Sequence, residues 1–200
     1  MTARAGSDRM RDRVLTVPNV ISVARLALIV VFLYLLLVTK ADGPAVAVLM
    51  LSGASDWVDG KLARLLDQSS ALGALLDPAI DRLYMVAIPI AFGIRGLVPW
   101  AIIGVLLARD VALAATLPAL RHRGLSALPV TYIGKAGTFA LMSAFPLILL
   151  GQCGAPWGPV VLSIGWAFLI WGLGLYLWAA VLYVIQVRLV VHTLPKVAGG

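Results

Sequence analysis

Charged residues, cysteine and histidine are all scarce in this 200-residue chain, and glutamate is missing altogether. Only 12% of the residues are charged and 62% are hydrophobic, whereas soluble domains have about 25% charged and roughly 45–50% apolar residues. The single cysteine, Cys153, excludes an internal disulfide and a cysteine-rich metal site. The shortage of charge is typical of an integral membrane protein, and the missing glutamate leaves every acidic role to aspartate.

The formal net charge of +7 does not indicate a nucleic-acid-binding protein. Neither a long basic face nor an aromatic platform for bases accompanies it. In so apolar a chain, basic residues instead set the orientation in the membrane, attract anionic lipid headgroups or bind substrate phosphates. We therefore expect the lipid bilayer, and not nucleic acid, as a partner.

Apolar runs separated by short polar or Gly/Pro-rich connections predict an all-α integral membrane protein with six transmembrane helices. The expected spans are residues 21–38, 45–66, 73–94, 98–120, 134–150 and 160–186. A short N-terminal interfacial helix is expected just before the first span. The predicted organisation is a cytoplasmic N-terminal segment that includes this helix, a six-helix transmembrane domain and a cytoplasmic tail, over residues 1–20, 21–186 and 187–200.

Basic residues are distributed unequally between the predicted connections. The side of the membrane away from the termini carries only Lys40 and Arg95. The side of the termini carries Arg4, Arg9, Arg11, Arg13, Lys61, Arg64, Arg121, Arg123, Lys135, Arg188 and Lys196. Because cytoplasmic loops are enriched in lysine and arginine, this asymmetry predicts that both termini lie in the cytoplasm.

Five of the nine acidic residues lie in one stretch, SDWVDGKLARLLDQSSALGALLDPAIDR, over residues 55–82. Asp56 and Asp59 fall near the end of the second expected span, and Asp77 and Asp81 near the start of the third. Spacings of three and four residues put each pair on one helix face. A short connection makes the two helices antiparallel neighbours, so we expect the four carboxylates to converge near the cytoplasmic surface.

Converging carboxylates repel one another and call for cations. Ligand sets made only of oxygen suit hard divalent ions such as Mg²⁺ or Mn²⁺, which neutralise phosphate oxygens during catalysis. Gly60 and Ala63 continue the face of the first aspartate pair and leave room for a bulky group. The alternative is that the aspartates form buried ion pairs with arginines, for which the candidates are Arg25, Arg64, Arg82 and Arg109.

The same stretch resembles the signature of the CDP-alcohol phosphotransferases. The matching pattern specifies eight residues over 26 positions: Asp56-x2-Asp59-Gly60-x2-Ala63-Arg64-x8-Gly73-x3-Asp77-x3-Asp81. The opening VPNVISVARL is similar to the start of bacterial phosphatidyl transferases, so the likeness extends over most of the chain. It implies a six-span enzyme of phospholipid biosynthesis in the bacterial plasma membrane, with its active site on the cytoplasmic side, and commonly a homodimer.

The resemblance also implies roles for the motif residues. A phosphatidyl group would pass from CDP-diacylglycerol to an alcohol with release of CMP, and Asp81 would be the general base. Two Mg²⁺ or Mn²⁺ ions would be held by Asp56, Asp59, Asp77 and Asp81. The CDP group would be bound by Asp56, Asp59, Gly60, Ala63, Arg64 and Gly73.

The acceptor alcohol rests on similarities outside this motif. The segments SALGALLDPAIDR, ARDVAL and PVTYIGKAGT look like those of eukaryotic-type cardiolipin synthases, which use phosphatidylglycerol. Phosphatidylglycerophosphate synthases, which use glycerol 3-phosphate, resemble the same core but more often carry Arg-Glu where Arg109-Asp110 stands here. Charge does not decide between the two acceptors, because either is anionic and could contact Arg109, Lys135 or Arg121.

Two interpretations outside this family are also open. Carboxylates within spans often line the ion path of a transporter, although such a path would distribute them across the membrane depth. A non-catalytic membrane scaffold would tolerate neutral replacements at all four aspartates.

Overall fold

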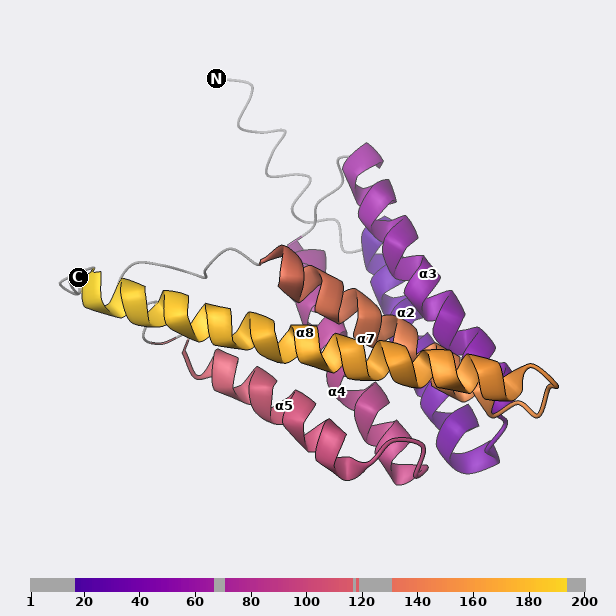
Figure 1. The fold of residues 1–200 in the computed structure, drawn as a ribbon. Coiled ribbons are helices and arrows are strands. Elements are labelled where there is room, and N and C mark those ends of the chain that lie inside the picture. The colour runs from indigo at the N-terminus through magenta and orange to yellow at the C-terminus, as the bar shows by residue number, and fades with distance from the viewer. Residues whose placement is uncertain (1–16, 67–70, 117, 119–130, 194–200) are drawn as a thin grey trace, which may run out of the picture. The chain divides into compact units, whose positions relative to one another are not determined.

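The computed structural model describes residues 17–66, 71–116, 118 and 131–193, and within the helices it describes the side chains of 23–55, 80, 82–116, 118 and 131–190. Over these residues the protein contains six α-helices and one π-helix and no β-strand (Figure 1). The all-α prediction is therefore confirmed. The chain divides between Leu97 and Val98 into two compact units, which are described in turn.

The first unit begins with helix α2, Val17–Leu33, which continues as the π-helix η1, Tyr34–Thr39. Pro18 lies in the first turn of α2, where its missing N–H removes no helical hydrogen bond. Residues 17–20 are thus part of α2, while the rest of the predicted N-terminal segment lies outside the described residues. Lys40 ends η1 in the left-handed conformation, with φ at 52°, at the turn that the sequence predicted.

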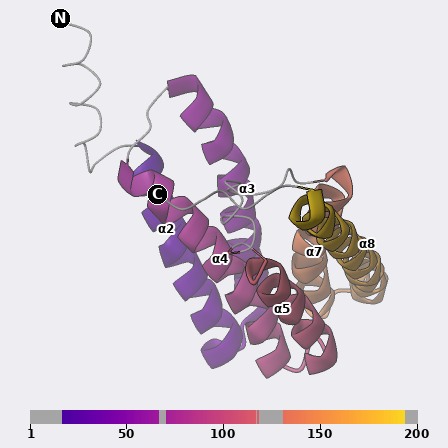
Figure 2. The same ribbon diagram turned by 90° about the vertical axis from the view of Figure 1, so that its left-hand side faces the viewer.

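Helices α3, Asp42–Leu66, and α4, Ala71–Ile94, complete this unit, and both pack against α2 (Figure 2). An ion pair between Asp42, at the start of α3, and Arg95, just after α4, holds these two ends together. Phe32, Leu36 and Phe92 are fully buried in its core. The predicted turn at Arg95-Gly96 is confirmed, because Gly96 has a φ of +70° that only glycine adopts easily.

The second unit contains α5, Trp100–Ala114, followed by α7, Tyr132–Gly151, and α8, Gly158–Thr193. Helix α5 ends six residues before the end of the fourth expected span, and 119–130 lie outside the described residues. Helix α8 continues seven residues beyond the sixth expected span. Beyond residue 186 the sequence contains no glycine or proline until Pro195, and proline disfavours helix in the residue before it.

Helices α7 and α8 lie side by side in both views and approach closely at glycines (Figures 1 and 2). A Cβ added at Gly165 would lie 2.8 Å from the backbone nitrogen of Ile148, and one at Gly137 would lie 3.0 Å from that of Tyr176. Small residues that allow such backbone contact are the usual means by which helices associate in membranes, where no hydrophobic effect drives them together.

Replacing Gly165 with alanine is expected to lower the free energy of unfolding by about 1–3 kcal/mol, because the new methyl group must push the two backbones apart. Gly174→Ala on the same helix is the matched control. No atom lies within 4 Å of the methyl group that it would add, so the higher helix propensity of alanine should stabilise it by up to about 1 kcal/mol. Unfolding in detergent measures both, and equal stabilities for the two variants would contradict this packing.

In the part of the chain that the structure describes, two helices are long and apolar enough to cross a membrane, over Tyr132–Gly151 and Gly158–Val190. Val23–Thr39 and Arg82–Ile94 are shorter apolar helical segments. Large apolar side chains also face outward on α8, including Trp171 at 70% and Trp178 at 56% exposed. Since soluble proteins rarely expose so large an apolar surface, lipid contact explains it best.

Candidate active site

The residues of the aspartate motif lie on α3 and α4, where the two helices connect. Positions 56–64 belong to the last turns of α3, and positions 73–81 to the first turns of α4. Only four residues, 67–70, separate the helices, so the chain can span at most about 18 Å from Leu66 to Ala71. Together with the ion pair between Asp42 and Arg95 at the other ends, this connection brings the two halves of the motif to the same end of the first unit, where α3 and α4 both pack on α2.

The side chains of the motif lie outside the described residues. The motif residues are Asp56, Asp59, Gly60, Ala63, Arg64, Gly73, Asp77 and Asp81. The convergence of the four carboxylates stays a prediction. Among the side chains that are described, no group of three or more His, Cys, Asp or Glu could hold a metal ion. The carboxylate donors of the motif are all oxygen atoms, as Mg²⁺ and Mn²⁺ prefer.

Helix α2 adds a buried cation to the same unit. Arg25 is only 6% exposed, although a buried guanidinium is costly unless nearby groups compensate it. From the sequence, Arg25 was expected only as a possible ion-pair partner of the aspartates. Arg82, another such candidate, is exposed on α4.

In the second unit, Arg109, Asp110 and Tyr176 form a connected cluster. Nη1 of Arg109 donates a hydrogen bond of 3.0 Å to Oδ1 of Asp110. The hydroxyl of Tyr176 donates one of 2.6 Å to the same oxygen. The guanidinium carbon of Arg109 also lies 3.8 Å from the centre of the Tyr176 ring, a cation–π contact. The carboxylate that Arg109 meets here is therefore that of its neighbour in sequence.

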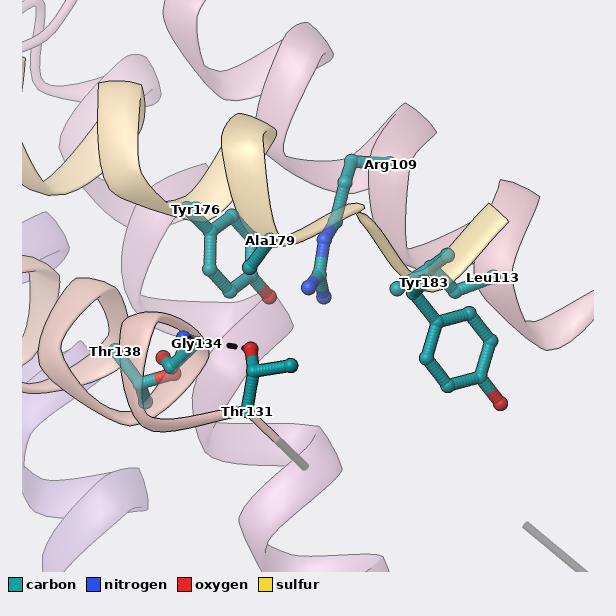
Figure 3. A pocket seen from close by; sticks show the side chains of 8 residues that line it. All are labelled: Arg109, Leu113, Thr131, Gly134, Thr138, Tyr176, Ala179 and Tyr183. Carbon is teal, nitrogen blue, oxygen red and sulfur yellow. Dashed lines mark hydrogen bonds between the residues drawn. The ribbon is translucent and has the colours of Figure 1, made fainter. Parts of the chain in front are cut away.

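This cluster borders a cavity of about 230 Å³ (Figure 3). The side chains and backbone that line it come from α5, α7, α8 and the cap of α7: Arg109, Leu113, Thr131, Gly134, Thr138, Tyr176, Ala179 and Tyr183. Arg109 is the one charged residue among these eight, and its side chain is 16% exposed. A cavity with a single guanidinium and several hydroxyl groups can accept a small anionic group.

The other two candidates for contact with the acceptor, Lys135 and Arg121, are not among the residues that line this cavity. Lys135 follows Gly134 on α7, but its side chain is exposed and its Nζ lies 5.6 Å from the ring centre of Tyr132. Arg121 lies outside the described residues.

The sequence did not reveal Tyr176 or the contacts that Asp110 makes with Arg109 and Tyr176. Tyr176, Ala179 and Tyr183 recur at intervals of three and four residues, so they share one face of α8. That spacing was a usable signal, but the apolar side chains around it on α8 conceal it. Thr131 was also missed; its hydroxyl caps α7 by accepting a hydrogen bond of 3.2 Å from the Gly134 nitrogen.

The similarity to known proteins covers both the aspartate motif and the cluster around Arg109. The profile of the CDP-alcohol phosphatidyltransferase family matches residues 15–178, which include the aspartate motif as well as Arg109, Asp110 and Tyr176. The chain therefore belongs to this family and is a phosphatidyltransferase of phospholipid biosynthesis.

Relatives of known name divide between two activities. A Mycobacterium tuberculosis protein named "Putative cardiolipin synthase" is 62% identical over 94% of this chain and 90% of its own length. The "Cardiolipin synthase (CMP-forming)" of Streptomyces coelicolor is 48% identical over 90% of this chain and 86% of its own. A "CDP-diacylglycerol--glycerol-3-phosphate 3-phosphatidyltransferase" of Cereibacter sphaeroides is 36% identical over 68% of this chain and 64% of its own.

Proposed function

We propose that this protein is a cardiolipin synthase, which transfers the phosphatidyl group of CDP-diacylglycerol to phosphatidylglycerol and releases CMP. The observation that carries the proposal is the 62% identity, over nearly the whole chain, to a protein named for that activity. The Streptomyces coelicolor relative, named for the CMP-forming reaction, supports the same acceptor. The transporter and scaffold interpretations are set aside, because the chain belongs to a family of transferases.

In this proposal the motif on α3 and α4 binds the CDP group and two divalent ions. Gly60, Ala63, Arg64 and Gly73 surround the CDP group, and the carboxylates of Asp56, Asp59, Asp77 and Asp81 hold Mg²⁺ or Mn²⁺. The donors suit either ion, because all of them are carboxylate oxygens on two neighbouring helix ends. When bound, the ions would neutralise the diphosphate and the charge that develops on the departing CMP.

Asp81 accepts the proton of the attacking hydroxyl in the proposed reaction. As this proton leaves, the hydroxyl oxygen of phosphatidylglycerol forms a bond to the phosphorus that carries diacylglycerol. The bond between that phosphorus and the oxygen bridging to the cytidine phosphate breaks, and CMP departs with the bonding electrons. The phosphate of the acceptor would be recognised by basic residues of the second unit, with Arg109 as the first candidate and Lys135 and Arg121 as further ones.

The membrane arrangement of this proposal follows from the sequence. All six expected spans cross the bacterial plasma membrane, with both termini and the active site on the cytoplasmic side. The unequal distribution of basic residues supports this orientation. A homodimer is proposed on the strength of the family resemblance alone.

Product analysis tests the acceptor directly. The purified protein, given CDP-diacylglycerol and Mg²⁺, should form cardiolipin and CMP in equal amounts when phosphatidylglycerol is supplied. Supplying glycerol 3-phosphate or inositol instead should give little product.

The second candidate acceptor is glycerol 3-phosphate, which the name of the Cereibacter sphaeroides relative favours. In the same assay, formation of phosphatidylglycerophosphate from glycerol 3-phosphate, with no cardiolipin from phosphatidylglycerol, would overturn the proposed acceptor and leave the family reaction intact.

A further inference from the structure

We infer that Tyr176 is a positioning residue, which holds the guanidinium of Arg109 in the orientation that binds the phosphate of the acceptor. This inference rests on the proposed function, because that proposal assigns Arg109 to the acceptor phosphate. Tyr176 lies on α8 and Arg109 on α5, so one helix sets the side-chain conformation of the other. Tyr176 acts through Arg109 and not on the reacting atoms.

Tyr176 restrains the arginine by two contacts. The guanidinium carbon of Arg109 lies 3.8 Å from the centre of the Tyr176 ring, so the ring supports the charged group by a cation–π contact. The Tyr176 hydroxyl donates a hydrogen bond of 2.6 Å to Oδ1 of Asp110. The same oxygen accepts the 3.0 Å hydrogen bond from Nη1 of Arg109. The hydroxyl therefore fixes the carboxylate that anchors the guanidinium.

Tyr176 is itself held firmly, which a positioning residue requires. The residue is only 8% exposed. Its backbone nitrogen lies so close to α7 that a Cβ added at Gly137 would be 3.0 Å away. A rigid aromatic residue thus restrains an arginine, whose long side chain has many rotamers.

The anchoring carboxylate and the cavity lie on different sides of this arrangement. Arg109 and Tyr176 belong to the lining of the cavity, whereas Asp110 does not. The carboxylate therefore anchors the guanidinium from outside the lining. Within the lining, Arg109 is the charged group that an anionic headgroup can contact.

Arg109 keeps enough donors for a phosphate. A guanidinium has five N–H groups, and the hydrogen bond to Asp110 uses one of them. Its Nε is buried and has no hydrogen-bond partner among the described residues. Figure 3 shows the guanidinium extending from α5 toward the hydroxyl of Tyr176, with the hydroxyl of Tyr183 turned away from it. The remaining donors can meet the two free oxygens of a phosphodiester.

Holding the guanidinium in advance favours binding of the acceptor. An arginine that is free to move loses rotamer entropy when it binds a ligand, whereas one that is already oriented loses less. Removing the contacts of Tyr176 should therefore weaken the binding of the acceptor. Binding of CDP-diacylglycerol should not change, because the proposal assigns that substrate to the motif on α3 and α4.

The experiment measures the KM for each substrate in the full-length protein, with the other substrate saturating. Tyr176→Leu removes both contacts and should raise the KM for phosphatidylglycerol about tenfold. Tyr176→Phe keeps the stacked ring and removes only the hydroxyl, so the same KM should rise about threefold. The KM for CDP-diacylglycerol should stay at the wild-type value in both variants.

Tyr34→Leu and Tyr34→Phe are the matched controls. They make the same two chemical changes at a tyrosine that is 56% exposed on η1. Both KM values should remain those of the wild type. A purely structural role of Tyr176 would reduce the amount of folded protein or change both KM values together, and either result without a selective rise in the KM for phosphatidylglycerol would overturn the inference.

A double-mutant cycle shows whether Tyr176 acts through Arg109. The guanidinium is gone in Arg109→Gln, so adding Tyr176→Phe to this variant should raise the KM for phosphatidylglycerol no further. Equal increases in the two backgrounds would show that Tyr176 acts independently of Arg109, against the inference. Should Arg109→Gln retain too little activity for a KM, the contrast between the two KM values of Tyr176→Phe decides.

The outcomes also distinguish this inference from the proposed function. If the wild-type protein forms cardiolipin and the Tyr176 variants keep its KM for phosphatidylglycerol, only the inference fails. If it forms phosphatidylglycerophosphate and no cardiolipin, the proposed acceptor fails, and the same comparison with glycerol 3-phosphate tests Tyr176. Should Tyr176→Leu not accumulate as folded protein, Tyr176→Phe decides, and a wild-type KM for the acceptor there overturns the inference.

Discussion

Replacing Asp81 with asparagine should reduce the rate of CMP release about 10³-fold, within the range that a general base contributes. Asparagine has nearly the same size and shape, but its amide cannot accept the proton of the attacking hydroxyl. The variant should therefore still insert into the membrane. Because Asp81 is also one of the proposed metal ligands, the assay is run at saturating Mg²⁺, so that the loss reports the missing base and not a weakened metal site. CMP release at saturating substrate measures the effect, and the retention of the variant on a gel-filtration column in detergent reports its folding.

Asp67→Asn is the matched control for this prediction. It makes the same chemical change in the same acidic stretch, at a position that the motif does not specify. It should retain close to wild-type turnover. Full activity in Asp81→Asn would remove the proposed base, and equal losses in both variants would show that the stretch tolerates no neutralisation.

Removing divalent metal should abolish turnover, and Mg²⁺ or Mn²⁺ should restore it. The expected effect is again large, because the diphosphate of CDP-diacylglycerol and the departing CMP would lose their neutralising charge. Asp59→Asn removes one carboxylate from the proposed ligand set and should raise the dissociation constant for Mn²⁺ at least tenfold, which the electron paramagnetic resonance of free Mn²⁺ measures without any turnover. Unchanged Mn²⁺ binding in Asp59→Asn would contradict its role as a ligand.

The ends of several helices could be predicted from the sequence, because local chemistry sets them. Gly96 supplies the positive φ after α4, and the polar residues around Lys40 separate the first two helices. The lengths of α5 and α8 could not be predicted in the same way. Hydropathy marks where a segment stops being apolar, whereas a helix continues until its backbone hydrogen bonds are interrupted, and on α8 this happens beyond Val190.

The candidate site was predictable to different degrees in its two parts. Aspartates within apolar runs indicate a functional site, because burying an ionised group in a membrane is costly and such groups are rare without a function. Arg109 was singled out on the same ground. Its contact with Tyr176 was not predictable, since 66 residues separate Tyr176 from Asp110 in the chain and only the packing of α5 on α8 brings them together.

The close contact of α7 with α8 at Gly137 has a consequence beyond stability. The backbone of Tyr176 lies directly against this glycine, so a side chain at position 137 would displace Tyr176 along or away from α7. Because Tyr176 contacts both Arg109 and Asp110, such a displacement would alter the charge balance of the cavity. The register between two apolar helices thereby sets the shape and charge of the cavity, which a substitution at a position outside its lining can alter.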